Sequence, residues 1–155
     1  MIQKLKNLFS IPPDDAQERS ERIEVATCVL LLEMAHADDT LAEVEERLIE
    51  KLMRQQFDLS AESAGELMEL ARAEQEKSVD LYRYGRQIHE NLTREEKQDV
   101  LRNLWRVIFA DGVMDMYEES LARQMTALLR LTHREMIDAK IAVQKERGKS
   151  QKTQR

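Results

Sequence analysis

Two short acidic segments are the part of this sequence whose residue types and spacing could do chemistry. Carboxylate oxygens gathered in such number are the ligands that hard divalent cations prefer. Ca²⁺ or Mg²⁺ therefore suits these segments better than Zn²⁺, which usually takes Cys or His ligands. The candidate metal ligands are Asp38, Asp39, Glu45, Asp111, Asp115 and Glu118.

The same acids have a second interpretation that needs no ion. Their spacing is not that of an EF-hand, whose loop places ligands at fixed positions around a glycine. Glu45 and Glu118 are expected in the first turn of a helix, where the helix dipole favours negative charge by roughly 0.3 to 1 kcal/mol. Asp39 and Gly112 fall where a helix would end in a left-handed residue. Metal binding and simple helix capping both remain open.

The two segments are related by one constant shift along the chain. Asp111 follows Asp38 by 111 − 38 = 73 residues, and the same shift matches an Ala, a Glu-Glu pair and a Leu. It also places Leu32 on Trp105 and Leu52 on Met125. We therefore expect an internal two-fold repeat of a helix–acidic turn–helix unit, with repeat units at about 23–75 and 96–144.

The elements that position these segments are expected to be helices only. The chain has 155 residues, few Gly, Pro and aromatic residues, and 35% charged residues, which favours an all-α, single-domain bundle of about seven helices. Thr93 with Glu96 and Thr132 with Glu135 are spaced as capping boxes. The predicted helices run from Asp14 to Asp38, from Ala42 to Gln56 with Val44 facing inward, from Ser60, from Ser78 to Asn91, from Thr93, from Asp115 to Leu129 and from Thr132.

Three segments are expected along the chain. Residues 1–13 form a short amphipathic helix and a Pro linker, and residues 1–9 could dock on the domain or make a peripheral membrane contact. Residues 14–144 form the helical domain. Residues 145–155 contain nothing apolar to bury and are expected to be a disordered basic tail.

The doubled acidic turn resembles the tellurite-resistance TerB family, in which Asp-Gly-x-aliphatic-x-x-x-Glu occurs twice in an all-helical chain. The resemblance covers about residues 23 to 137, with Asp39 in place of the usual Gly and Met114 in place of Ile or Leu. It implies a stress-associated or tellurite-resistance role and a metal site at Asp38, Glu45, Asp111 and Glu118. A related domain occurs in DnaJ-like co-chaperones, which implies the alternative of a non-catalytic adaptor that binds a protein partner.

An adaptor needs a partner surface, and one stretch of the predicted fourth helix offers residue types common at binding hot spots. It contains Tyr82, Arg83, Tyr84 and Arg86. The plainer interpretation is that Tyr82 packs and the arginines are solvated. The sequence does not identify the partner or the oligomeric state.

Other function classes have less support. No nucleophile elbow, phosphate loop or zinc motif is present, so we expect no enzyme. His89 and His133 are isolated in the sequence, and Cys28 lies among apolar residues as a buried thiol of a reducing compartment. A net charge of −6 argues against nucleic acid as a partner. We expect a cytoplasmic protein without a transmembrane segment.

Overall fold

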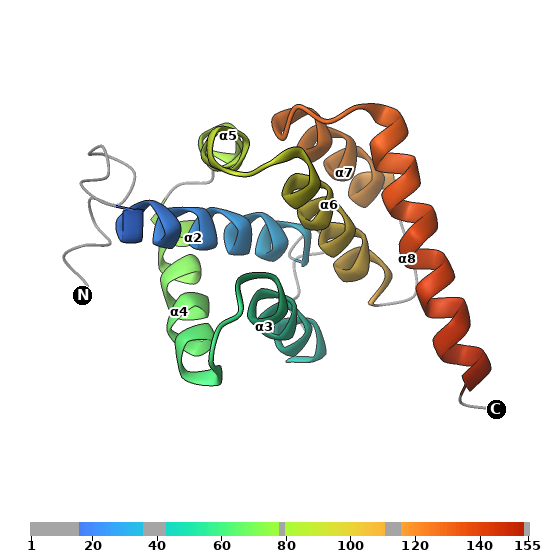
Figure 1. The fold of residues 1–155 in the computed structure, drawn as a ribbon, viewed down its shortest axis with the longest axis horizontal. Coiled ribbons are helices and arrows are strands. Elements are labelled where there is room, and N and C mark those ends of the chain that lie inside the picture. The colour runs from blue at the N-terminus through green and yellow to red at the C-terminus, as the bar shows by residue number, and fades with distance from the viewer. Residues whose placement is uncertain (1–15, 36–42, 78–79, 111–115, 154–155) are drawn as a thin grey trace.

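The computed structural model describes residues 16–35, 43–77, 80–110 and 116–153, and every element within these ranges is a helix (Figure 1). This confirms the all-α prediction. The seven helices of the described ranges are α2 (Ala16–Ala35), α3 (Glu43–Phe57), α4 (Ala61–Lys77), α5 (Leu81–Asn91), α6 (Arg94–Phe109), α7 (Met116–Leu128) and α8 (His133–Thr153).

Side-chain caps determine where several helices begin. The Thr93 hydroxyl accepts from the Glu96 amide at 3.1 Å, and the Glu96 carboxylate accepts from the Thr93 amide at 2.9 Å, so the predicted capping box opens α6. Thr132 and Glu135 make the same reciprocal pair before α8. These contacts satisfy amides that lack partners within the helix.

The start of α5 differs from the prediction. Ser78 was expected to open this helix, but α5 begins at Leu81, and Asp80 is its N-cap, accepting from the Arg83 amide. A carboxylate is as good a cap as a hydroxyl, and Asp80 lies two residues further along the chain. Ser78 itself lies outside the described residues, and the helix ends at Asn91 as predicted.

The turns after α3 and α7 are built alike. Asp58 and Arg130 have positive φ values of 53° and 56°. In both turns the next amide reaches back five residues, from Leu59 to the Arg54 carbonyl and from Leu131 to the Thr126 carbonyl, each at 3.0 Å. This is the Schellman ending of a helix, in which a left-handed residue lets the chain fold back onto the last turn.

Helices α2 and α6 are at the centre of the bundle (Figure 1). Helix α2 packs on α3, α4 and α6, while α6 packs on α7, α8 and α2. The second helix of each predicted repeat unit also packs on the first helix of the other predicted unit, α3 on α6 and α7 on α2. A two-fold repeat predicts these matching contacts, and the duplication itself remains a prediction.

The core runs through both halves. Leu32 and Trp105, which the 73-residue shift makes equivalent, are both buried, and so are Leu52 and Met125. Trp105 stacks on Phe109 with ring centroids 5.6 Å apart. Helix α5 lies between the two predicted units in sequence, and it packs on α2 and α7.

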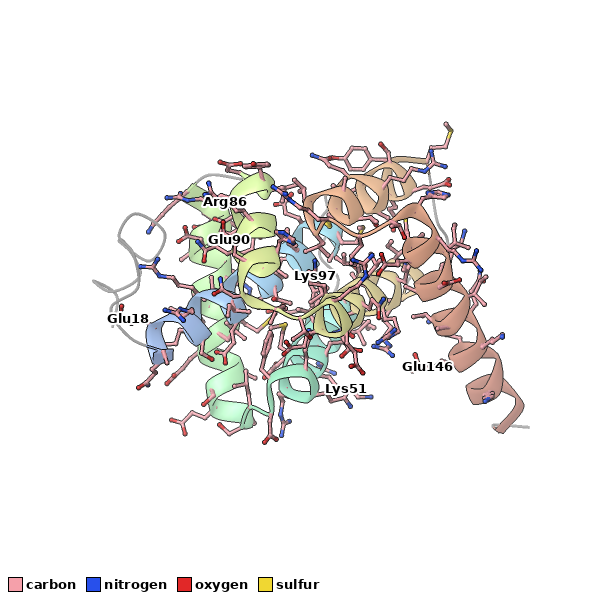
Figure 2. All side chains as sticks on the ribbon, turned by 45° about the horizontal axis from the view of Figure 1, so that its top comes forward. Glu18, Lys51, Arg86, Glu90, Lys97 and Glu146 are labelled. Carbon is pink, nitrogen blue, oxygen red and sulfur yellow. The ribbon has the colours of Figure 1, made fainter. Side chains whose placement is uncertain are left out.

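The C-terminal end also differs from the prediction. Residues from 145 onward were expected to be a disordered basic tail, but α8 continues to Thr153. A helix already docked on the bundle extends at little cost because each added residue makes one hydrogen bond, and Lys, Arg, Gln and Glu are good helix formers. Arg106 of α6 also holds this part of α8 through an ion pair with Glu146 at 3.0 Å (Figure 2 labels Glu146).

Two further predictions concern the ends of the chain and membranes. The amphipathic helix and Pro linker predicted for residues 1–13 lie outside the described residues. Across the described ranges, no helix is both long enough and apolar enough to cross a membrane.

Candidate functional site

Two of the six predicted metal ligands lie in the described part of the chain. Glu45 is in the first turn of α3 and Glu118 is in the first turn of α7. The other four lie outside the described residues. They are Asp38, Asp39, Asp111 and Asp115.

Both glutamates are buried. The exposed fraction is 8% for Glu45 and 6% for Glu118. Their neighbours one residue earlier, Val44 and Tyr117, are 69% and 61% exposed. The prediction that Val44 faces inward was therefore wrong, and in both helices an acid takes the inward position while an apolar residue faces solvent.

Helical phase explains this inversion in α3. Glu45 precedes the buried Ile49 by four residues and the buried Leu52 by seven, and residues at these spacings lie on one helix face. Val44 is one residue out of phase. The side chains of Ile49 and Leu52 fix the rotation of α3, and the carboxylate of Glu45 follows them inward.

The same phase holds in α7. Glu118 precedes the buried Leu121 by three residues and the buried Met125 by seven. Since 118 − 45 = 73, Glu118 corresponds to Glu45 in the predicted repeat. Helices α3 and α7 thus each bury a carboxylate at the third residue of the helix.

The adjacent acids behave differently. Glu46 forms an ion pair with Arg72 of α4, and Glu119 forms one with Arg123 at 3.1 Å within α7. These side chains are partly exposed, so such pairs contribute little to stability. Glu46 and Glu119 therefore act as surface ion-pair partners, and their side chains are more exposed than those of Glu45 and Glu118.

A buried carboxylate must be compensated by hydrogen bonds, by a positive charge or by a metal ion. Among the described residues no three acidic, His or Cys side chains gather closely enough to hold a metal ion. A complete ligand set would need the aspartates of the two turns as well as Glu45 and Glu118. An all-carboxylate set of this kind fits Ca²⁺ or Mg²⁺ by its chemistry.

The residues of the proposed tyrosine and arginine surface on α5 do not all face the same way. Tyr84 is buried, and its hydroxyl donates to Glu74 Oε1 at 3.3 Å, while Tyr82 is exposed. The expectation that Tyr82 packs was therefore wrong, because Tyr84 occupies the inward phase of α5. Arg86 forms an ion pair with Glu90 at 2.9 Å on the outer face of this helix (Figure 2).

Cys28 and His89 are two other side chains with reactive groups. Cys28 is buried as predicted, with Sγ 3.6 Å from Met68 Sδ, and burial raises the pKa of its thiol to about 12. His89 is not isolated in the fold, because its Nδ1 lies 3.0 Å from Lys97 Nζ. No local sequence pattern indicates this contact, since the two residues lie on different helices.

The chain is similar to a described protein family over most of its length. The family model described as tellurite resistance protein TerB matches residues 24–141, which is most of the chain. A search of curated proteins and a search of solved structures each found no match.

Proposed function

Because this chain belongs to the TerB family, we propose that it binds a divalent cation, Ca²⁺ or Mg²⁺, through its two acidic turns. The family places the chain among tellurite-resistance-associated proteins. The ligands in this proposal are Asp38, Asp39, Glu45, Asp111, Asp115 and Glu118. The activity is non-catalytic, and the ion would hold the two units together.

The burial of Glu45 and Glu118 carries this proposal. The helix dipole explains an acid in the first turn of α3 or α7, but it acts equally on a solvent-exposed acid such as Glu43. It gives no reason for the acid to take the core-facing position while Val44 and Tyr117 face solvent. A bound cation would favour the inward carboxylate in addition to the interactions that Glu45 and Glu118 already make within the protein.

The packing of the helices supports a role for both turns together. Helix α3 packs on α6 and α7 packs on α2, so the first turns that carry Glu45 and Glu118 belong to helices that reach across the two units. Each acidic turn joins the two helices of one unit. An ion bound by both turns would therefore stabilise the contact between units.

Calorimetric titration tests the proposal. Protein freed of metal by a chelator is titrated with Ca²⁺, Mg²⁺, Mn²⁺ and Zn²⁺, and its thermal stability is measured with each ion. We expect saturable heat and a raised melting temperature with Ca²⁺ or Mg²⁺, and a stoichiometry of one ion per chain for a shared site. No heat and no stabilisation with any of the four ions would refute metal binding.

Matched variants test which residues contribute to cation binding. Glu45→Gln and Glu118→Gln keep side-chain size and remove the charge, and each is expected to weaken binding at least tenfold. Glu119→Gln is the control, because Glu119 is the neighbour of Glu118 and forms an exposed ion pair. Equal weakening by the control would show that general surface charge attracts the ion.

One observation favours a second function, a protein-interaction module. Val44, Met116 and Tyr117 are large apolar side chains exposed at the starts of α3 and α7, beside the acidic turns. Large apolar side chains that lie together on a surface often mark a binding site, and this second function requires the starts of α3 and α7 to form one such surface. The variants Val44→Ser and Tyr117→Ser, used as baits beside the unchanged protein in extracts of stressed cells with and without Ca²⁺, test it. A partner retained equally by all three baits would exclude this surface.

A further inference from the structure

Lys97 of α6 is a buried lysine that joins three parts of the fold. Only 5% of this residue is exposed. Its Nζ donates to the Leu129 carbonyl at the end of α7 at 3.0 Å and lies 3.0 Å from His89 Nδ1 of α5. Lys97 lies inside the bundle between these helices (Figure 2). A single ammonium group therefore links α5, α6 and the end of α7.

This arrangement requires a neutral His89. A lysine ammonium has three donors and no acceptor, so the Nδ1 atom of His89 must be the acceptor of this hydrogen bond. The ring proton then lies on Nε2. A second proton on Nδ1 would remove the acceptor and place two positive charges 3.0 Å apart.

Burial and the nearby positive charges also favour the neutral form of His89. Burial lowers the pKa of His89, and the charges of Lys97 and Arg130 lower it further, while Glu90 and a hydrogen bond with the Leu129 backbone oppose them. Burial likewise lowers the pKa of Lys97. The charges of Arg94 and Arg130 lower it further, while the charge of Glu135 raises it. Helix α2 also packs on α5, but no charged group of its described residues is among those acting on His89.

We propose that His89 and Lys97 form a proton-sensitive clamp that holds α5 to α6 and to the end of α7, and that acidification opens it. Protonated His89 repels Lys97 and Arg130, so the ammonium group and the ring must separate. The segments released are the last turn of α5, next to Asn91, and the turn at Leu129 and Arg130.

The direction of the pH effect follows from the lowered pKa of His89. The folded state binds the proton less readily than the unfolded state, in which the histidine has its ordinary pKa of about 6.5. The contribution of His89 to stability is therefore constant above this pH, and it falls as the pH drops from about 6.5 through the lower pKa of His89 in the folded protein. A histidine that gained an acidic partner would show the opposite trend.

Two histidine variants test the clamp in the full chain. In His89→Gln the amide oxygen can still accept from Lys97 but cannot be protonated, while His133→Gln removes the exposed histidine at the start of α8 as a control. Melting temperatures are measured between pH 7.5 and 5. The unchanged protein and His133→Gln are expected to lose more stability on acidification than His89→Gln. Parallel pH profiles for all three proteins would overturn the proposal.

A third variant gives a readout that does not depend on stability. NMR titration of the His89 ring reports its protonation directly, and Lys97→Met removes the neighbouring charge while keeping an apolar side chain. The midpoint for His89 is expected to rise in this variant, because the positive charge beside the ring is gone. Hydrogen exchange of the last turn of α5 and of residues 128–131, corrected for intrinsic rates, should accelerate at low pH. An unchanged His89 midpoint in Lys97→Met, or exchange that does not respond to pH, would equally contradict the clamp.

Discussion

Gly85 of α5 lies directly against Leu128 of α7. A Cβ atom placed on Gly85 would be 2.7 Å from Leu128 Cβ and 3.3 Å from the Leu128 carbonyl oxygen. Both atoms belong to or adjoin the backbone, so they cannot move aside as the end of a long side chain could. The missing side chain of Gly85 therefore sets how closely α5 approaches α7.

Gly85→Ala is expected to destabilise the protein by roughly 1 to 3 kcal/mol, because the new methyl group overpacks the α5–α7 contact. Gly65→Ala in α4 is the matched control, since a Cβ there meets nothing within 4 Å. That change should instead stabilise by up to about 1 kcal/mol through helix propensity. Urea unfolding of both variants measures the two effects, and equal effects of the same sign would contradict the close contact.

Cys28 should be unreactive in the folded protein. Burial raises the pKa of its thiol to about 12, with Arg72 opposing this, against an ordinary value of about 9. Only the thiolate reacts, so ionisation alone should slow modification by a disulfide reagent on the order of a thousandfold relative to the unfolded chain. Rates in buffer and in urea measure this ratio. Modification in buffer at the rate of a free thiol would contradict the buried position.

Glu135 should contribute acid-sensitive stability. Burial raises the pKa of its carboxyl group, but hydrogen bonds from Thr132, Gln98 and Arg94 outweigh that and lower the pKa to about 2. Since the folded pKa lies below the ordinary value of 4.5, the stabilisation is complete above about pH 4.5 and is lost as the pH falls toward 2.

Glu135→Gln is therefore expected to cost roughly 2 kcal/mol at pH 7 and much less at pH 3. Glu95→Gln, an exposed acid in the first turn of α6, serves as the control and should change stability little at either pH. Denaturant unfolding at the two pH values gives the comparison. A cost for Glu135→Gln that does not depend on pH would show that the carboxylate charge is not the source.

Features that depend on a few adjacent residues were predictable from the sequence. The capping boxes at Thr93 and Thr132 fixed the starts of α6 and α8 because the interacting groups are three residues apart. The end of α8 was not predictable from composition alone, because its extension depends on the preceding helix being docked. The left-handed Arg130 was also missed, since this residue type gives no turn signal.

For the candidate site, the residue types were predictable and the orientation was only partly so. Both acidic turns are visible as sequence, and Glu45 shares a helical phase with Ile49, which was the available signal for its burial. The apolar type of Val44 suggested the opposite orientation, and packing of the later turns of α3 overrode it. The contact of Lys97 with His89 could not be predicted, because it depends on how α5 and α6 fold against each other.

The most direct test of the account is the response of the Glu45 and Glu118 carboxylates themselves to a divalent cation. Their side-chain ¹³C resonances can be followed during titration of the metal-free protein with Ca²⁺ or Mg²⁺, with Glu43 and Glu119 as internal controls. We predict that the resonances of Glu45 and Glu118 move together and saturate at the same ion concentration, while those of Glu43 and Glu119 stay nearly constant. If the resonances of Glu45 and Glu118 do not move, or move only as much as those of the exposed acids, the proposed metal site is wrong.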